Sequence, residues 1–134
     1  MAKISSFKQD LTKESEGVWF DFESGIRVLI ASTNSPKFKK FLKALTKPHI
    51  QAIRSNTASV DLQTALFKKA GSKYLVLDWE NIEDDDGNPI ECTPENCLEI
   101  FNDPALREFY NFVVQSAGSA EAFRVEFEAE SAGN

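Results

Sequence analysis

The sequence has little of what metal and redox sites are built from. Its 134 residues include one histidine, His49, and two cysteines, Cys92 and Cys97. A closed zinc site needs four nitrogen or sulfur ligands, which these three residues cannot supply. The spacing between the two cysteines also differs from that of a C-x-x-C redox pair. We therefore expect two reduced thiols and no metal site.

The common enzyme motifs are missing too. The chain has no P-loop, no G-x-G-x-x-G, no G-x-S-x-G and no H-E-x-x-H pattern. The acidic turn at residues 84–86 does not match an EF-hand loop, which needs carboxylate ligands at positions 1 and 12 and a Gly at position 6. With Gly87 at position 6, Ile82 and Thr93 occupy positions 1 and 12. Weak cation binding at this turn stays open. We expect a protein that is not an enzyme and holds no cofactor.

Long hydrophobic runs are absent as well. No apolar stretch approaches the ~20 residues of a membrane span, and the N-terminus leads into no signal-peptide core. The sequence therefore predicts a cytoplasmic protein that does not bind membranes.

Charge, in contrast, is plentiful and uneven. Residues 1–75 carry 13 Lys/Arg and 6 Asp/Glu, a net charge of +7, whereas residues 76–134 carry 2 Lys/Arg and 15 Asp/Glu, a net charge of −13. Such halves can attract one another between copies, head to tail, and so build rings or open arrays. A polarised surface without a partner is the alternative. Since the whole chain has a net charge of −6, we expect no nucleic-acid partner.

The hydrophobic pattern predicts a mainly α fold with a small N-terminal β-hairpin (α+β), forming a single compact helical domain over residues 17–134. The polar residues 1–16 are expected to form a mobile arm or a short helix. Two β-prone runs, residues 18–22 and 26–31, flank a Glu-Ser-Gly turn and predict the hairpin.

Helices are predicted mainly from their start signals. The predicted helices cover 36–47 and 57–70, start at Thr93-Pro94 and Asp103-Pro104, and end with 120–130. Residues 74–77 could be a strand or a helix end, and Phe123, Val125 and Phe127 also alternate like a strand.

Residues 74–90 (YLVLDWENIEDDDGNPI) resemble the tail assembly chaperone family of long-tailed, siphovirus-like bacteriophages. Members typically show an apolar stretch, a Trp, an acidic segment and then D-G-x-P-I. Two further family segments follow here, TPEN at 93–96 and DPALREF at 103–109, and Phe123 corresponds to the family's late Phe.

The upstream part of the chain is similar to the same family. GVWFD at 17–21 and IRV at 26–28 match the opening hairpin, and SPKF at 35–38 matches an N-P-x-(Y/F) helix start, with Ser35 where Asn is common. The resemblance covers about residues 17–134, and it rests on the order and spacing of the motifs rather than on any one of them.

The resemblance implies a non-enzymatic chaperone that coats and solubilises the tape measure protein before the tail tube polymerises around it. It also implies action in the host cell cytoplasm and absence from the mature virion. Many members have a longer form, made by ribosomal frameshifting, that recruits the tail tube protein. The alternative is a structural phage tail subunit, such as a tail completion or tube-associated protein.

A chaperone of this kind needs apolar surface on a water-soluble chain, and the sequence has eleven phenylalanines. The candidate partner contacts are Phe38, Phe41, Trp79, Phe109 and Phe112, with core packing as the alternative for each.

The last three residues bear on frameshifting. Ala132, Gly133 and Asn134 can be encoded GCG-GGA-AAC, which contains a heptamer on which two tRNAs can re-pair one base back. The chain is therefore expected to be the short form of a frameshifted pair if that codon choice is used.

Overall fold

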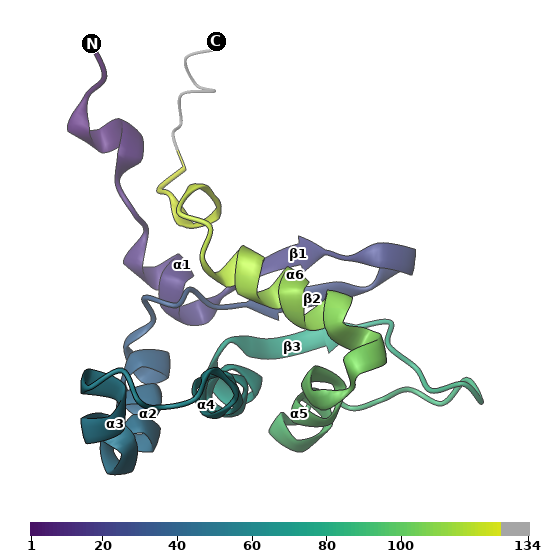
Figure 1. Cartoon of the computed structure of the whole chain (residues 1–134). Helices are drawn as coiled ribbons and strands as arrows, with labels where there is room; N and C mark the ends of the chain where they lie inside the picture. The colour runs from purple at the N-terminus through teal and green to yellow at the C-terminus, as the bar shows by residue number, and fades with distance from the viewer. Residues whose placement is uncertain (127–134) are drawn as a thin grey trace, which may run out of the picture.

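Three antiparallel strands form the sheet of the computed structural model, which describes residues 1–126 (Figure 1). The strands are β1 (Val18–Asp21), β2 (Arg27–Ile30) and β3 (Val76–Glu80), in the order β1-β2-β3. The predicted hairpin is confirmed, with Phe20 opposite Val28. For residues 74–77 the sequence left a helix end and a strand open, and the structure has both: a helix ends at Tyr74 and a strand begins at Val76.

Within residues 1–126, six α-helices accompany this sheet. They are α1 (Leu11–Glu16), α2 (Pro36–Thr46), α3 (Ile50–Arg54), α4 (Val60–Tyr74), α5 (Pro94–Asn102) and α6 (Arg107–Ala117). Short 3₁₀ segments lie between them: η1 (Ile4–Phe7), η2 (Glu23–Gly25), η3 (Lys47–His49), η4 (Pro104–Leu106) and η5 (Glu121–Phe123). The expectation of a mainly α fold with a small N-terminal hairpin is confirmed, and β3 adds a third strand to it.

Two of the three cap-then-proline signals act as predicted, whereas α2 begins after Ser35 without a side-chain cap hydrogen bond. The Thr93 hydroxyl accepts a hydrogen bond from the backbone N–H of Asn96 (3.1 Å) and starts α5. The Asp103 carboxylate accepts one from Ala105 (2.9 Å) and starts η4, which leads into α6. Each cap satisfies a backbone N–H that has no partner within its helix.

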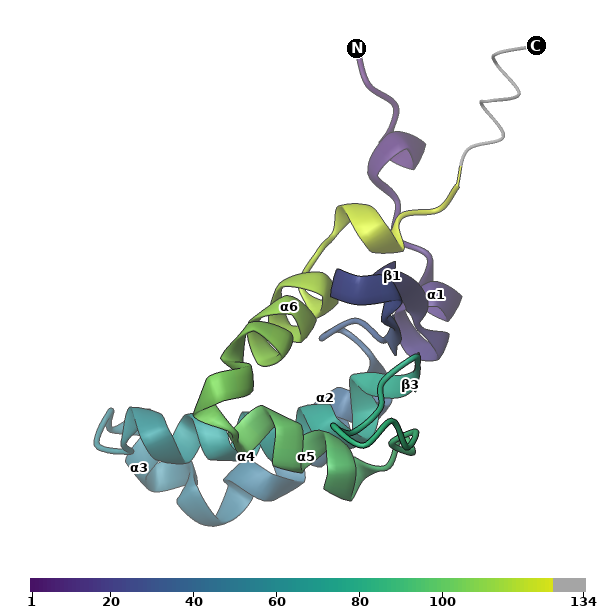
Figure 2. The same cartoon turned by 90° about the vertical axis from the view of Figure 1, so that its right-hand side faces the viewer.

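The core lies between one face of the sheet and α6 and continues among α2, α4 and α5. Phe20, Val28 and Trp79 stand opposite one another across the three strands and so share a face. On α6, Phe112 contacts Phe20 edge-on (centroids 6.4 Å apart) and Phe109 contacts Trp79 likewise (6.2 Å). Figure 1 shows α6 crossing the sheet, while α2, α3, α4 and α5 gather below it; Figure 2 shows the same grouping from the side.

Helix α4 extends further than the sequence pattern predicts. Gly71 was expected just beyond a helix over 57–70, yet the helix runs through it to Tyr74. Gly71 is buried, and a Cβ there would lie 3.3 Å from Leu75 Cδ1 and 3.7 Å from Phe101 Cε2. The glycine therefore leaves room for the Leu75 side chain, and it lies inside the helix instead of ending it.

The expected last helix, 120–130, is wrong over its described part. Only η5 (Glu121–Phe123) is helical, and Arg124 is extended and pairs with Gln9. The backbone N–H of Asp10 donates to the Phe123 carbonyl oxygen (2.7 Å), and that of Val125 donates to the Lys8 carbonyl oxygen (2.8 Å). Pairing with the N-terminal segment replaces helical hydrogen bonds here, and residues 127–130 lie outside the described part.

The N-terminal segment leaves the body of the molecule. Residues 8–10 are held by the pairing just described, and the Lys13 ammonium contacts Glu126 at 3.2 Å. Residues 1–7, which include η1, project away from the sheet and the helices (Figures 1 and 2). The mobility expected for residues 1–16 stays a prediction. No helix within residues 1–126 is both long and apolar enough to cross a membrane.

Candidate functional site

The five aromatic residues proposed from the sequence do not form one surface. Phe38, Trp79 and Phe109 are buried in the core, whereas Phe41 and Phe112 are half-buried. Three of the rings, Trp79, Phe109 and Phe112, belong to the packing between the sheet and α6, and Phe38 faces Phe67 of α4 (5.4 Å). In this fold the three buried rings have almost no surface to offer a partner. Phe41 lines two surface hollows, beside Lys73 and Tyr74.

The charged residues, in contrast, separate along the chain. Nine cations and one carboxylate, Asp61, lie between residues 31 and 75. The nine are Lys37, Lys39, Lys40, Lys43, Lys47, Arg54, Lys68, Lys69 and Lys73. Within residues 1–126, ion pairs join Lys13 to Glu126 and Arg27 to Asp21 and Glu80, and none involves these nine cations.

A groove of about 460 Å³ opens among four of these cations, between α2 and α3. Pro48 lies in η3, just after α2. This segment turns the chain, so that α3 returns alongside α2. Ala44 and Ile50 provide apolar lining, and the rim carries the cations Lys40, Lys43, Lys47 and Arg54. We call this hollow the basic groove. Its chemistry suits an amphipathic segment with carboxylates at its edges.

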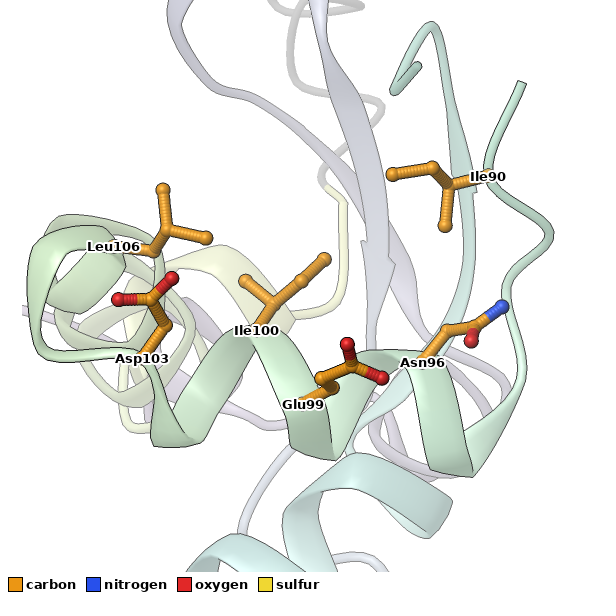
Figure 3. A pocket seen from close by; sticks show the side chains of 6 residues that line it. All are labelled: Ile90, Asn96, Glu99, Ile100, Asp103 and Leu106. Carbon is orange, nitrogen blue, oxygen red and sulfur yellow. The ribbon is translucent and has the colours of Figure 1, made fainter. Parts of the chain in front are cut away.

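The acidic residues are concentrated later in the chain. Residues 76–103 contain ten Asp/Glu and no Lys or Arg. A second groove, of about 340 Å³, lies here between the loop at Ile90 and the end of α5 (Figure 3). We call it the acidic groove; it is lined by Ile90, Asn96, Glu99, Ile100, Asp103 and Leu106.

The D-G-x-P-I motif has a structural role beside this groove. The Asp84 carboxylate accepts hydrogen bonds from the backbone N–H groups of Asp86 and Asn88 (both 2.9 Å), and Gly87 has a φ of +85°. These bonds, chiefly the one from Asn88, lower the pKa of Asp84. The Trp79 indole N–H then donates to the Ile90 carbonyl oxygen at 2.7 Å. The motif thus fixes where Ile90 lies, and the lowered pKa makes Asp84 a poor proton donor.

The thiols are placed for packing rather than for chemistry. Cys97 is buried on α5 and Cys92 is half-buried, and both are free. Burial, with the charge of Asp78 adding to it, raises the pKa of Cys92 to about 12, and burial also raises the pKa of Cys97. The reactive thiolate is therefore suppressed at neutral pH. Within residues 1–126, no three His, Cys, Asp or Glu side chains are grouped to hold a metal ion.

Sequence reasoning missed a group of exposed apolar side chains at the N-terminus. Ile4, Phe7 and Leu11 are all exposed, Ile4 at 79% and Phe7 at 57% of their full surface. The signal was present in the sequence, because positions 4, 7 and 11 follow a helical three–four spacing inside a polar stretch. It also missed Ala44 and Ile50, whose shared groove depends on how α3 returns against α2.

Comparison with known proteins gives one match. The sequence model of a family described as "YdaY prophage protein" matches residues 33–134. No curated protein and no solved structure matches the chain. The matched stretch contains helices α2 to α6, strand β3 and both grooves, and it begins after the β1–β2 hairpin.

Proposed function

The chain belongs to the family of YdaY prophage proteins, and from that premise we propose that it is a non-enzymatic tail assembly chaperone of its phage. In this role it coats and solubilises the tape measure protein before the tail tube polymerises. It acts in the host cell cytoplasm and leaves before the virion is complete. A longer, frameshifted form recruits the tail tube protein.

Two observations support this proposal over a catalytic role. The phage origin of the family agrees with the motif order that resembles tail assembly chaperones, from the Trp79 segment through the Asp103-Pro104 segment. The described part of the chain also offers buried, poorly ionised thiols and one histidine instead of an activated nucleophile.

The basic groove is the observation that carries the proposal. A holdase must bind an aggregation-prone helical client through apolar contact and yet release it. Ala44 and Ile50 offer that apolar contact, and the surrounding lysines can pair with carboxylates on an amphipathic client helix. Exposed ion pairs of this kind are individually weak and screened by salt, which suits a contact that later subunits displace.

Coating a long client also calls for many copies. We propose that neighbouring copies attract one another through the basic and acidic halves of the chain, which carry net charges of +7 and −13. Because these surfaces differ, the contact is head to tail and extends into an array rather than closing as a simple pair.

The test is co-expression with the tape measure protein of the same prophage. The wild-type chain should raise the soluble fraction of that protein and co-purify with it. Lys43→Glu, on the rim of the basic groove, should weaken binding by about tenfold. Lys39→Glu makes the same charge change on the same helix outside the groove, so it should bind as the wild type does.

Two outcomes would count against the proposal. Equal loss of binding in both variants would show that total charge matters and the groove does not. If the chain fails to solubilise the tape measure protein and is instead found in purified particles, the structural tail subunit becomes the better reading.

A further inference from the structure

Two apolar side chains near the N-terminus project from the molecule without cover. Ile4 and Phe7 stand at the two ends of the single turn η1, and with three residues per turn they lie on the same side of it. Lys3 and Lys8 flank them, and residues 1–9 contain no Asp or Glu. We call residues 1–8 the arm: a short basic segment with two exposed apolar side chains.

The acidic groove has the complementary chemistry. Ile90, on the loop, lies opposite Ile100 and Leu106, and Glu99 and Asp103 lie beside them along the end of α5 (Figure 3). Leu106 is 45% exposed, so apolar surface is open to solvent here as well. An apolar floor with carboxylates at its edge matches the arm's apolar side chains and flanking lysines.

We propose that the arm of one copy of this chain binds in the acidic groove of a second copy. Ile4 and Phe7 cover the surface of Ile100 and Leu106, and Lys3 and Lys8 lie near Glu99. This inference does not depend on the client proposed above, since it concerns contacts between identical chains. It assigns a particular pair of surfaces to the attraction between the basic and acidic halves.

The geometry favours a second copy over the arm's own groove. The root of the arm, residues 8–10, pairs with residues 123–125, which follow the C-terminal end of α6. Leu106 precedes the N-terminal end of the same helix, which is about 16 Å long at 1.5 Å per residue. The arm points away from α5 in both views (Figures 1 and 2). Another copy can receive it without any refolding, whereas its own groove requires the arm to turn back along the molecule.

The contact is small, so it should be weak and dependent on concentration. Sedimentation velocity of the full chain at low salt should show an apparent mass that rises at least about twofold between dilute and concentrated samples. The double substitution Ile4→Ser, Phe7→Ser should keep the chain monomeric. Val60→Ser, which removes an apolar side chain that is 77% exposed on α4, should associate as the wild type does.

A mixing experiment tests the direction of the contact. Leu106→Glu places a charge in the groove at an exposed position, and this variant should also be monomeric by itself. Mixed together, the arm variant keeps an intact groove and the groove variant keeps an intact arm. The mixture should therefore form a one-to-one complex and nothing larger.

Each other result overturns the inference. Wild-type chain that stays monomeric at all concentrations, association that survives either variant, or a mixture that stays monomeric would each refute the contact. Because no client is present, such a failure leaves the result of the co-expression test unaffected. If the chain solubilises the client while it stays strictly monomeric, the chaperone role stands and the contact between copies is refuted.

Discussion

Replacing Trp79 by Phe should destabilise the fold by a defined amount. The change removes the indole N–H that donates to the Ile90 carbonyl oxygen at 2.7 Å. Leaving a part-buried acceptor unpaired costs about 1–2 kcal/mol, toward the lower end of the usual range. The smaller ring also loses roughly 40 Å² of buried apolar surface against Phe109, worth about 1 kcal/mol. The free energy of unfolding should therefore fall by about 2–3 kcal/mol, which lowers the melting temperature by about 6–12 °C.

Urea unfolding followed by far-UV circular dichroism measures this change without relying on tryptophan emission. Trp19→Phe is the matched control, because Trp19 is half-buried on the other face of the sheet, where its ring contacts the Arg27 guanidinium at 5.1 Å. That variant should lose less than about 1 kcal/mol. If the two variants were equally stable, the indole hydrogen bond would not hold the turn before Ile90, and the structural role given to this motif would be wrong.

Three further predictions follow from local geometry. Gly17 has a φ of +87°, and a Cβ there would lie 3.1 Å from Leu29 side-chain atoms. Gly17→Ala should therefore lower the free energy of unfolding, measured in urea, by about 2–4 kcal/mol. Gly87→Ala is the control: Gly87 has a similar φ but lies in open space, so this change should cost only about 1 kcal/mol. The lowered pKa of Asp84 means that its contribution to stability is present above the unfolded-state pKa and is lost as the pH falls through the folded-state pKa. Asp84→Asn should therefore flatten the acid limb of the pH–stability curve, and an unchanged limb would contradict this. Burial raises the pKa of both thiols, so at neutral pH they should react with iodoacetamide at least about 100-fold more slowly in the native chain than in urea. Mass spectrometry measures the two rates, and equal rates would show that the thiols are accessible in the native chain.

The turn motif around Trp79 and the basic groove lie on different parts of the chain. The residues that resemble a tail assembly chaperone, such as Trp79 and Asp84, largely build the fold around the turn. The basic groove and the arm lie outside these motifs, whereas the acidic groove is lined by Ile90, Asp103 and Leu106 from them. Substitutions that break the turn should therefore act mainly through stability, and those at Lys43, Phe7 or Leu106 mainly through binding.

Local sequence signals were sufficient for much of the secondary structure. The hairpin followed from two β-prone runs around a short turn, and the starts at Thr93 and Asp103 followed from caps placed before proline. These signals work because a cap or a turn is decided by hydrogen bonds within a few residues. The separation of charge into a basic and an acidic half was likewise already visible in the sequence.

Tertiary packing decided what local signals could not. Gly71 looks like the end of a helix but lies inside one, where the side chains of Leu75 and Phe101 pack over it. Arg124 is extended instead of continuing a helix, because residues 123–125 meet residues 8–10 from the other end of the chain.

The same limit applies to the candidate site. A pattern of aromatic residues is identical whether the rings face the core or the solvent, so the burial of Trp79 and the exposure of Ile4 and Phe7 could be learned only from what packs against each of them. Both grooves arise where separate segments meet, α3 against α2 and the Ile90 loop against α5. The sequence by itself determined the elements and the charges, whereas contacts between distant segments determined which surfaces remain open for binding.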